Sequence, residues 1–448
     1  MEKNEHKRDG FRSRSGFIIA CIGSAVGMGN IWRFPMLVST WGGLTFLLPY
    51  FIFVILIAST GVIEEFALGR AGGAGPMGSF GMCTELRYGK RKIGERIGYI
   101  PILGSLALAI GYTCVMGWIF KYTFLSFTGD LFSMGQDMDV INGTFGGTAS
   151  AWGANIWIIV AIAASFAIMS FGIAGGIEKA NKVMMPVLFA LFLALGVYIF
   201  TLDGSSDGYK YILTINPKGL ADPKLWIYAF GQAFFSLSVT GSGMIVYGAY
   251  LSDEEDVVGV AQHTALFDTI AAVVAALVII PACFAYGQDV GAGPSLLFVT
   301  LPTILQDLPL GRLFAIILYV AMIFAGVSSL QNMFEAVAES LMHKFPKLSR
   351  TAVLAILCVL CLGFGIGMEP ISKWGPWMDL VSIYIIPIGA TLGAISWFYV
   401  MKKSELLNAV NTGSTKQRGK LWYSVGRYVY VPLALILCCV ALFMQVAF

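Results

Sequence analysis

The sequence predicts an all-α polytopic membrane protein, and three observations support this fold class. Hydrophobic residues make up 57% of the 448 residues and charged residues only 12%, whereas soluble domains carry roughly 25% charged residues. The mean hydropathy is +0.77. Apolar runs recur along the whole chain, each near or above the ~18–20 residues that cross the hydrocarbon of a bilayer. The small net charge of +3 gives no reason to expect a nucleic-acid partner.

The apolar runs divide the chain into eleven expected membrane spans within one transporter-like domain, 1–448. A tail (1–13) precedes a first group of five spans (14–201), a second group of five (225–401) and an eleventh helix (422–447). The expected spans are 14–40, 43–69, 98–127, 153–173, 177–201, 225–250, 257–287, 311–342, 349–368, 375–401 and 422–447.

The distribution of basic residues orients these spans. Placing the N-terminus in the cytoplasm collects 22 of the 29 basic residues on the cytoplasmic side, in the tail and in alternate loops such as RYGKRKIGER. Cytoplasmic loops of membrane proteins carry an excess of Lys and Arg. We therefore expect a multi-pass protein of the cell membrane with a cytoplasmic N-terminus and, because eleven is odd, an extracellular C-terminus.

Two of the expected spans contain residues that break helices. The first holds GSAVGMGNIWRFP (23–35), and the sixth holds SLSVTGSG (236–243). Gly is unfavourable in helix interiors and Pro removes a backbone donor, so each helix should be interrupted at mid-membrane. The first and sixth spans each open a group of five. Broken helices at matching positions of two halves indicate a transporter built as a 5+5 inverted repeat.

The two breaks have a chemistry of their own. Exposed N–H groups at the start of a half-helix favour a carboxylate, and bare carbonyls suit a hard cation such as Na⁺. Asn30 adds a side-chain carbonyl in the first break. An amino acid that binds together with sodium fits this description.

These residues resemble the signature of the neurotransmitter:sodium symporter family, the LeuT-type transporters. The resemblance covers the whole chain in order: GSAVGMGNIWRFP in the first span, GQAFFSLS (231–238) in the sixth, AGVSSLQ (325–331) in the eighth, and Asp379 in the tenth. It implies a LeuT-type 5+5 inverted repeat plus an eleventh helix, as in bacterial members. It also implies symport of an amino acid with two sodium ions by alternating access.

The resemblance assigns roles residue by residue. The first sodium site would use the Ala25 carbonyl, Asn30, Ser236 and Asp268. The second would use the carbonyls of Gly23, Val26 and Ala325 with the hydroxyls of Ser328 and Ser329, although membrane serines more often bond to their own helix. The substrate pocket would be lined by Ala25, Met28, Gly29, Leu108, Tyr112, Phe234, Phe235, Ser236, Ser238, Gly241 and Met333.

Within that pocket, the resemblance gives Tyr112 the substrate carboxylate and makes Phe235 the aromatic lid. Gly241 stands where the leucine-type relative has a bulky aromatic, which predicts extra space. Flexible Met walls without a buried charge suit a neutral, hydrophobic or aromatic side chain. Tryptophan, tyrosine, phenylalanine and leucine are therefore the candidate substrates.

The resemblance also places gates and a hinge. Arg33 and Asp379 would form an outer gate, and intramembrane charges are functional candidates by default. Arg8 matches the inner-gate arginine, but the family's acidic partner falls at His343, so Glu339 is a candidate replacement. Gly176 and Pro186 in GIEKANKVMMP match a motif at which the fifth helix unwinds, although they could simply mark a helix start and a kink.

Asp268 is the main departure from the family, because many members have Asn there and animal relatives add a chloride ion. Two sodium ions and a zwitterion bring two positive charges, which a carboxylate partly offsets. We therefore expect chloride-independent transport. A proton-coupled transporter of the same fold, with Asp268 as proton carrier, is the alternative. A channel lacks the polar file it would need, and an enzyme lacks any metal triad or activated nucleophile.

Overall fold

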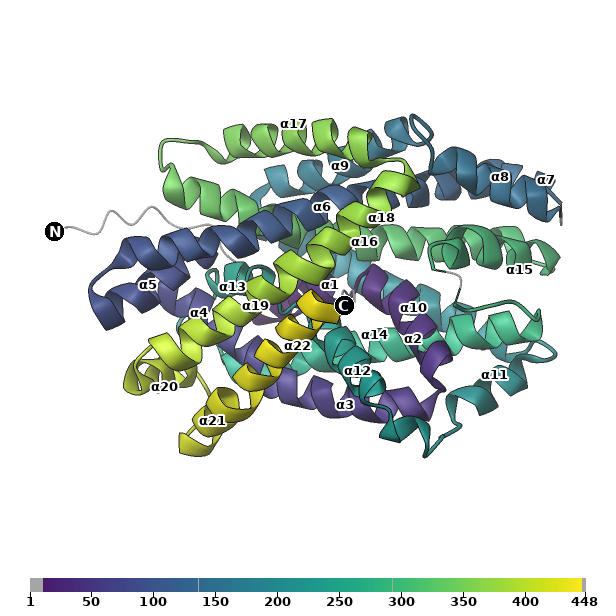
Figure 1. Ribbon diagram of the computed structural model, residues 1–448. Helices are drawn as coiled ribbons and strands as arrows, with labels where there is room; N and C mark the ends of the chain where they lie inside the picture. The colour runs from purple at the N-terminus through teal and green to yellow at the C-terminus, as the bar shows by residue number, and fades with distance from the viewer. Residues whose placement is uncertain (1–10, 136, 292, 445–448) are drawn as a thin grey trace.

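The computed structural model describes residues 11–135, 137–291 and 293–444, and within these ranges the secondary structure is entirely helical (Figure 1). The first half contains α1 (Arg14–Ala25), α2 (Phe34–Trp41), α3 (Leu44–Ile57), α4 (Ile63–Gly72), α5 (Pro76–Tyr88), α6 (Arg91–Thr128), α7 (Asp130–Ser133), α8 (Met138–Thr148), α9 (Asn155–Ser170) and α10 (Lys179–Phe200). The second half contains α11 (Ser205–Ile212), α12 (Pro223–Ser236), α13 (Gly243–Gly248), α14 (Val257–Ala285), α15 (Leu301–Asp307), α16 (Gly311–Lys344), α17 (Arg350–Met368), α18 (Ile371–Asp379), α19 (Ile386–Ile395), α20 (Lys403–Asn411), α21 (Lys420–Val425) and α22 (Val431–Met444).

Within the described ranges, eight helices are long and apolar enough to cross a membrane, counting helices that continue through a π-helical turn as one. The pair α1 and α2, bent by 54°, makes a ninth. The expected fourth span is the shorter apolar helix α9, and the expected sixth is divided between α12 and α13. Each of the eleven expected segments therefore contains helix.

The third span begins earlier than the apolar pattern predicts. Its helix α6 starts at Arg91 and not near residue 98, because the polar first turns are also helical. Arg91 forms an ion pair at 3.0 Å with Glu95, one turn later on the same helix. These turns pack along α5, which lies beside α6 in Figure 1. Packing and the ion pair together extend the helix beyond its apolar part.

The first span breaks where its glycines predict. The helix α1 ends at Ala25, and Val26 has extended backbone angles. The side chain of Asn30 then accepts a hydrogen bond of 3.1 Å from the backbone N–H of Gly27, which the break leaves without a helical partner. The second half-helix starts with a π-helical turn, Gly29–Arg33, that continues into α2. Pro35 follows this turn, where the π-helical bonding changes to α-helical, and the helix continues through it to Trp41.

The sixth span breaks between α12 and α13. Ser238 and Gly241 have positive φ angles of 52° and 74°. The Gly241 N–H donates to a carboxylate oxygen of Glu65 on α4 at 2.7 Å, which satisfies one backbone donor inside the protein. A Cβ on Gly241 would lie only 2.3 Å from the carbonyl oxygen of Gly389 on α19. The irregular backbone of the break at Gly241 therefore contacts the helical backbone of α19 at Gly389.

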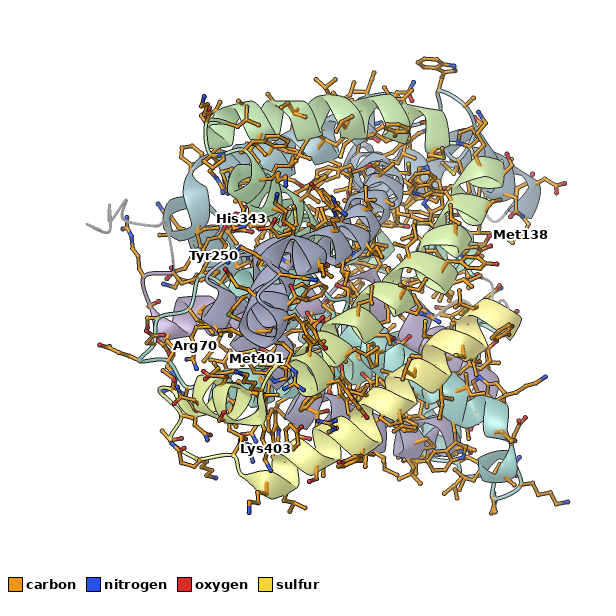
Figure 2. The ribbon with its side chains drawn as sticks, turned by 60° about the vertical axis from the view of Figure 1, so that its left-hand side comes forward. Arg70, Met138, Tyr250, His343, Met401 and Lys403 are labelled. Atoms are coloured by element: carbon orange, nitrogen blue, oxygen red, sulfur yellow. The ribbon has the colours of Figure 1, made fainter. Side chains whose placement is uncertain are left out.

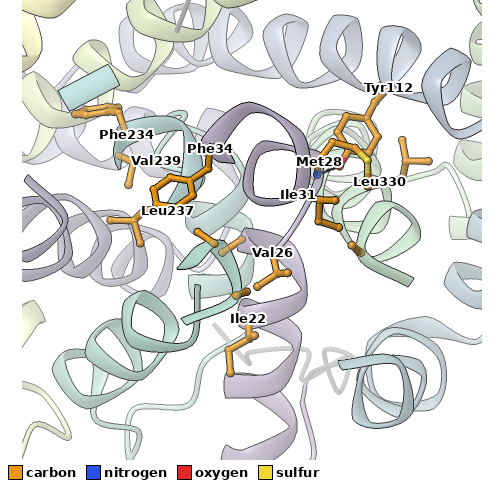
Figure 3. Close-up of a cluster of buried hydrophobic side chains, with 14 of the residues drawn as sticks. Ile22, Val26, Met28, Ile31, Phe34, Tyr112, Phe234, Leu237, Val239 and Leu330 are labelled. Carbon is orange, nitrogen blue, oxygen red and sulfur yellow. Dashed lines mark hydrogen bonds between the residues drawn. The ribbon is translucent and has the colours of Figure 1, made fainter. Parts of the chain in front are cut away.

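The broken first span lies in the middle of the molecule. Its half-helix α1 packs against α10, α14 and α16, and Phe17, Cys21 and Ile22 are buried there. Figure 3 shows Ile22, Val26 and Phe34 of this span among side chains of the sixth span such as Leu237. The two breaks are thus held next to each other by a surrounding apolar core.

Arg70, near the end of α4, joins three parts of the chain. Its guanidinium donates to the carbonyl of Glu255 in the loop before α14 at 2.7 Å. It also donates to the carbonyls of Ala409 (2.9 Å) and Thr412 (2.7 Å) at the end of α20. Figure 2 places Arg70 at the same end of the molecule as Lys403 and Tyr250, opposite Met138. Loops that follow the sixth and tenth spans are therefore bound to the second span.

Candidate functional site

The two helix breaks enclose a cavity at the centre of the molecule. Nine of the eleven residues predicted for the substrate pocket line it: Ala25, Met28, Gly29, Leu108, Tyr112, Phe235, Ser236, Ser238 and Met333. Asn30 and Ser329, predicted for the two sodium sites, also line it. The lining further includes residues that sequence reasoning did not select: Ser24, Gly27, Pro101, Gly104, Ser105, Thr240, Ser242, Asn332 and Ile386. The cavity therefore combines an apolar wall with many hydroxyl and amide groups.

Two predicted pocket residues do not line this cavity. The ring of Phe234 stacks on Tyr430 with centroids 6.0 Å apart, so it faces the eleventh helix. The open side of Gly241 is filled by the backbone of Gly389. The absent side chain of Gly241 thus allows two backbones to approach, in place of the predicted space for a substrate.

This contact gives a prediction for stability. Gly241→Ala would place a methyl group against the Gly389 carbonyl on a left-handed backbone, and each effect costs about 1–2 kcal/mol. We expect a clearly lowered melting temperature in detergent and weakened ligand binding. Gly363→Ala on α17 is the matched control, because its added Cβ meets nothing within 4 Å. Equal melting temperatures for both variants would contradict the role assigned to Gly241.

Tyr112 connects the third span to the first break. It is buried on α6, and its hydroxyl accepts a hydrogen bond of 2.9 Å from the backbone N–H of Met28 (Figure 3). A Cβ on Gly27 would lie 2.8 Å from the same hydroxyl, so only glycine lets the backbone come this close. The hydroxyl and the Met28 backbone amide therefore face one region, which suits a carboxylate.

The residues predicted for the first sodium site form a buried polar cluster. The amide nitrogen of Asn30 donates to Asp268 at 2.7 Å and to the hydroxyl of Ser236 at 3.3 Å. That hydroxyl donates to the second carboxylate oxygen of Asp268 at 2.7 Å. Asp268 is completely buried in α14. A carboxylate, a hydroxyl and amide or carbonyl oxygens form the donor set that a hard cation prefers.

The residues predicted for the second sodium site also lie together, between α1 and α16. The Ser328 hydroxyl donates to the carbonyls of Gly23 (2.7 Å) and Ala325 (2.9 Å). The Ser329 hydroxyl lies 3.5 Å from the Val26 carbonyl. The bond from Ser328 to Ala325 is the ordinary bond of a membrane serine to its own helix. That ordinary role does not explain the contacts that Ser328 and Ser329 make with the broken first span.

A second cavity adjoins the first and contains the predicted outer gate. Both Arg33 and Asp379 line it, and it shares Met28, Tyr112 and Phe235 with the central cavity. The Arg33 guanidinium lies over the ring of Phe235, 5.5 Å from its centroid. Phe235 thus separates the two cavities, and the charged residue contacts it from the outer side.

The remaining predicted positions are the inner-gate candidates and the hinge of the fifth span. Arg8 lies outside the described residues. Glu339 accepts a hydrogen bond from the Gly75 N–H at 2.5 Å, at the start of α5. Gly176 belongs to a π-helical turn, Ile173–Glu178, that precedes α10, and Pro186 lies inside α10. Glu178 is the last residue of this turn. Its carboxylate accepts hydrogen bonds from the Arg12 backbone N–H and the Ser13 hydroxyl, and so connects the fifth span to the start of the first.

The chain matches the sodium:neurotransmitter symporter family over residues 8–136 and 146–447, and it belongs to this family of transporters. It is 31% identical, over 97% of both chains, to an uncharacterized sodium-dependent transporter of Bacillus subtilis. It is 29% identical to one of Methanocaldococcus jannaschii over 93% of this chain and 87% of the relative. The crystal structure of MhsT in complex with L-phenylalanine matches with a TM-score of 0.85 and 31% identity, over 97% of this chain and all of that one. The protein is therefore a sodium-dependent membrane transporter with the LeuT-type fold.

Proposed function

We propose that the protein is a symporter that moves neutral, hydrophobic or aromatic amino acids together with two sodium ions by alternating access. The observation that carries this proposal is the central cavity, in which the backbone of two broken helices meets Tyr112 and the cluster around Asp268. The complex of the similar protein MhsT with L-phenylalanine supports an aromatic substrate.

In this proposal the substrate carboxylate binds where the first span breaks. The Tyr112 hydroxyl and the backbone amides near Met28 donate to it, which is the interaction that helix N-termini offer to anions. Hydrogen bonds to a charged group contribute about 1.5–3 kcal/mol each. Phe235 closes the cavity on the outer side, with Arg33 and Asp379 beyond it as the outer gate.

The two sodium ions are cargo that drives the transport. Asn30, Ser236 and Asp268, with the Ala25 carbonyl, would hold the first. The Gly23, Val26 and Ala325 carbonyls with Ser328 and Ser329 would hold the second between two helices. Because that ion joins the broken first span to α16, its loss would free the two to move apart. Asp268 supplies a fixed negative charge, so we propose that transport needs no chloride.

The movement between outward and inward states would use the fifth span. Its turn with Gly176 is π-helical in place of α-helical, and Pro186 removes one donor further along. Unwinding there would admit water to the second sodium site. The distribution of positive charges supports a cytoplasmic N-terminus and an extracellular C-terminus, in a lipid bilayer of the cell membrane.

Uptake of labelled tryptophan into proteoliposomes tests this proposal. An inward sodium gradient is compared with potassium and with a proton gradient alone. We expect accumulation with sodium only, inhibited by leucine and tyrosine and not by lysine or glutamate. Uptake driven by protons alone would favour the alternative, in which the buried carboxyl of Asp268 carries the proton. Absence of uptake and of binding for every neutral amino acid would overturn both.

A further inference from the structure

The central cavity has a polar end that the transport of a purely apolar side chain does not explain. We propose that Thr240 and Ser242 form a subsite for a hydrogen-bonding group at the far end of the substrate side chain. On this inference, which rests on the proposed function, the protein binds tyrosine, and after it tryptophan, more tightly than phenylalanine or leucine.

The first step is the position of these hydroxyls relative to the carboxylate end of the cavity. Tyr112, Leu108, Ser105 and Pro101 line the cavity along α6. At a rise of 1.5 Å per residue, the eleven residues from Tyr112 to Pro101 span about 16 Å. The cavity is thus elongated along α6, and its two ends are far enough apart to receive the two ends of a large amino acid.

The second step places Thr240 at the end away from Tyr112. A Cβ on Gly389 would lie 2.9 Å from the Thr240 carbonyl and 3.1 Å from the Pro101 side chain. Gly389 therefore contacts both residues, and Thr240 lies at the level of Pro101. Ser242 follows directly, because its hydroxyl is 2.8 Å from that of Thr240. The pair of hydroxyls therefore faces the distal end of a bound side chain.

The third step counts hydrogen-bonding capacity. Two hydroxyls provide two donors and four acceptor positions, and their mutual bond uses one of each. One donor and three acceptor positions remain at the cavity wall. The Ser24 hydroxyl, also in the lining and buried, has no hydrogen-bond partner among the described residues. The other polar groups there are engaged: Ser105 donates to the Met333 carbonyl and Asn332 to the Gly243 carbonyl.

The fourth step concerns selectivity. A pocket built to bond a polar group rejects the analogue that lacks it, because its own polar atoms are then buried without partners. A phenyl ring against Thr240 and Ser242 would have this effect, whereas a phenol can donate to one hydroxyl and accept from another. An indole N–H can donate only, which places tryptophan second. A charged end group has no opposite charge in the described lining.

Binding of tyrosine and phenylalanine tests the inference, because the two amino acids differ by one hydroxyl. Dissociation constants are measured in sodium buffer by competition against labelled leucine on the purified full-length protein. We expect tyrosine to bind about tenfold more tightly, a difference of about 1.4 kcal/mol. Thr240→Val with Ser242→Ala keeps the volume and removes both hydroxyls, so the ratio should fall to near one while leucine binding persists.

Thr113→Val is the matched control, because that threonine is buried on α6 and its hydroxyl donates to the carbonyl of Ile110 in its own helix. It should leave the tyrosine-to-phenylalanine ratio unchanged. Wild-type protein that binds both amino acids equally would overturn the inference and leave the proposed function intact, and this measurement needs no variant. A ratio that survives in the double variant would also overturn it. Failure of every neutral amino acid to bind would reject the proposed function as well.

Discussion

Asp268→Ala is expected to abolish sodium-driven uptake of amino acids. The side chain accepts hydrogen bonds from Asn30 and Ser236, so its loss removes both the charge and the organising centre of the first proposed sodium site. Two unit charges about 4 Å apart interact by about 4 kcal/mol at an effective dielectric constant of 20. A loss of that size weakens sodium binding by about a thousandfold. Sodium titration of substrate binding measures it directly.

Asp268→Asn separates charge from shape. The amide keeps the size and part of the hydrogen bonding, and so any uptake that remains should require chloride in place of gluconate as the anion. Asp207→Asn is the control, because Asp207 is exposed and pairs with Lys210 at 2.9 Å on α11. Full uptake by the asparagine variant in gluconate would show that the carboxylate charge is dispensable. Wild-type uptake that fails in gluconate would contradict the proposal of chloride independence.

Tyr112→Phe is expected to weaken substrate binding by about ten- to a hundredfold. It removes a hydroxyl that bonds the Met28 N–H and that we propose donates to the substrate carboxylate. A hydrogen bond to a charged group contributes about 1.5–3 kcal/mol, which corresponds to that range of affinity. Equilibrium binding of labelled substrate at saturating sodium gives the number.

Tyr122→Phe offers a matched control for this experiment. Tyr122 is buried on the same helix, ten residues later, and its hydroxyl has no hydrogen-bond partner among the described residues. Its replacement should leave affinity unchanged. If the two variants lost affinity equally, the effect would come from packing in α6 and not from contact with the substrate.

Much of the fold could be predicted because the bilayer imposes strict rules on sequence. Long apolar runs set the helices, and the glycines near Val26 and Gly241 set the two breaks, as the structure confirms. The start of α6 at Arg91 could not be predicted, since hydropathy does not detect helix that is held by packing and an ion pair.

For the candidate site, the predictions differ between regular helices and the break of the sixth span. Tyr112 on α6 lines the central cavity, and Asp268 on α14 contacts Asn30, because helical periodicity fixes the direction of a side chain on a regular helix. In the break of the sixth span no periodicity exists. The backbone turns left-handed at Ser238 and Gly241, which turns Gly241 toward α19 and brings Thr240 and Ser242 to the cavity wall. The segment SLSVTGSG predicts hydroxyl groups at mid-membrane, and the structure shows which of them reach the cavity.

The carbonyl contacts of Arg70 bear on how the chain responds to cutting. Because one side chain binds Glu255, Ala409 and Thr412, the peptide that follows the tenth span is fastened to the second span independently of its own covalent connection. A single tryptic cut after the exposed Lys402 would therefore leave two fragments that stay associated in detergent, and the last helix would copurify with the rest. Without Arg70, the same cut would release it more readily.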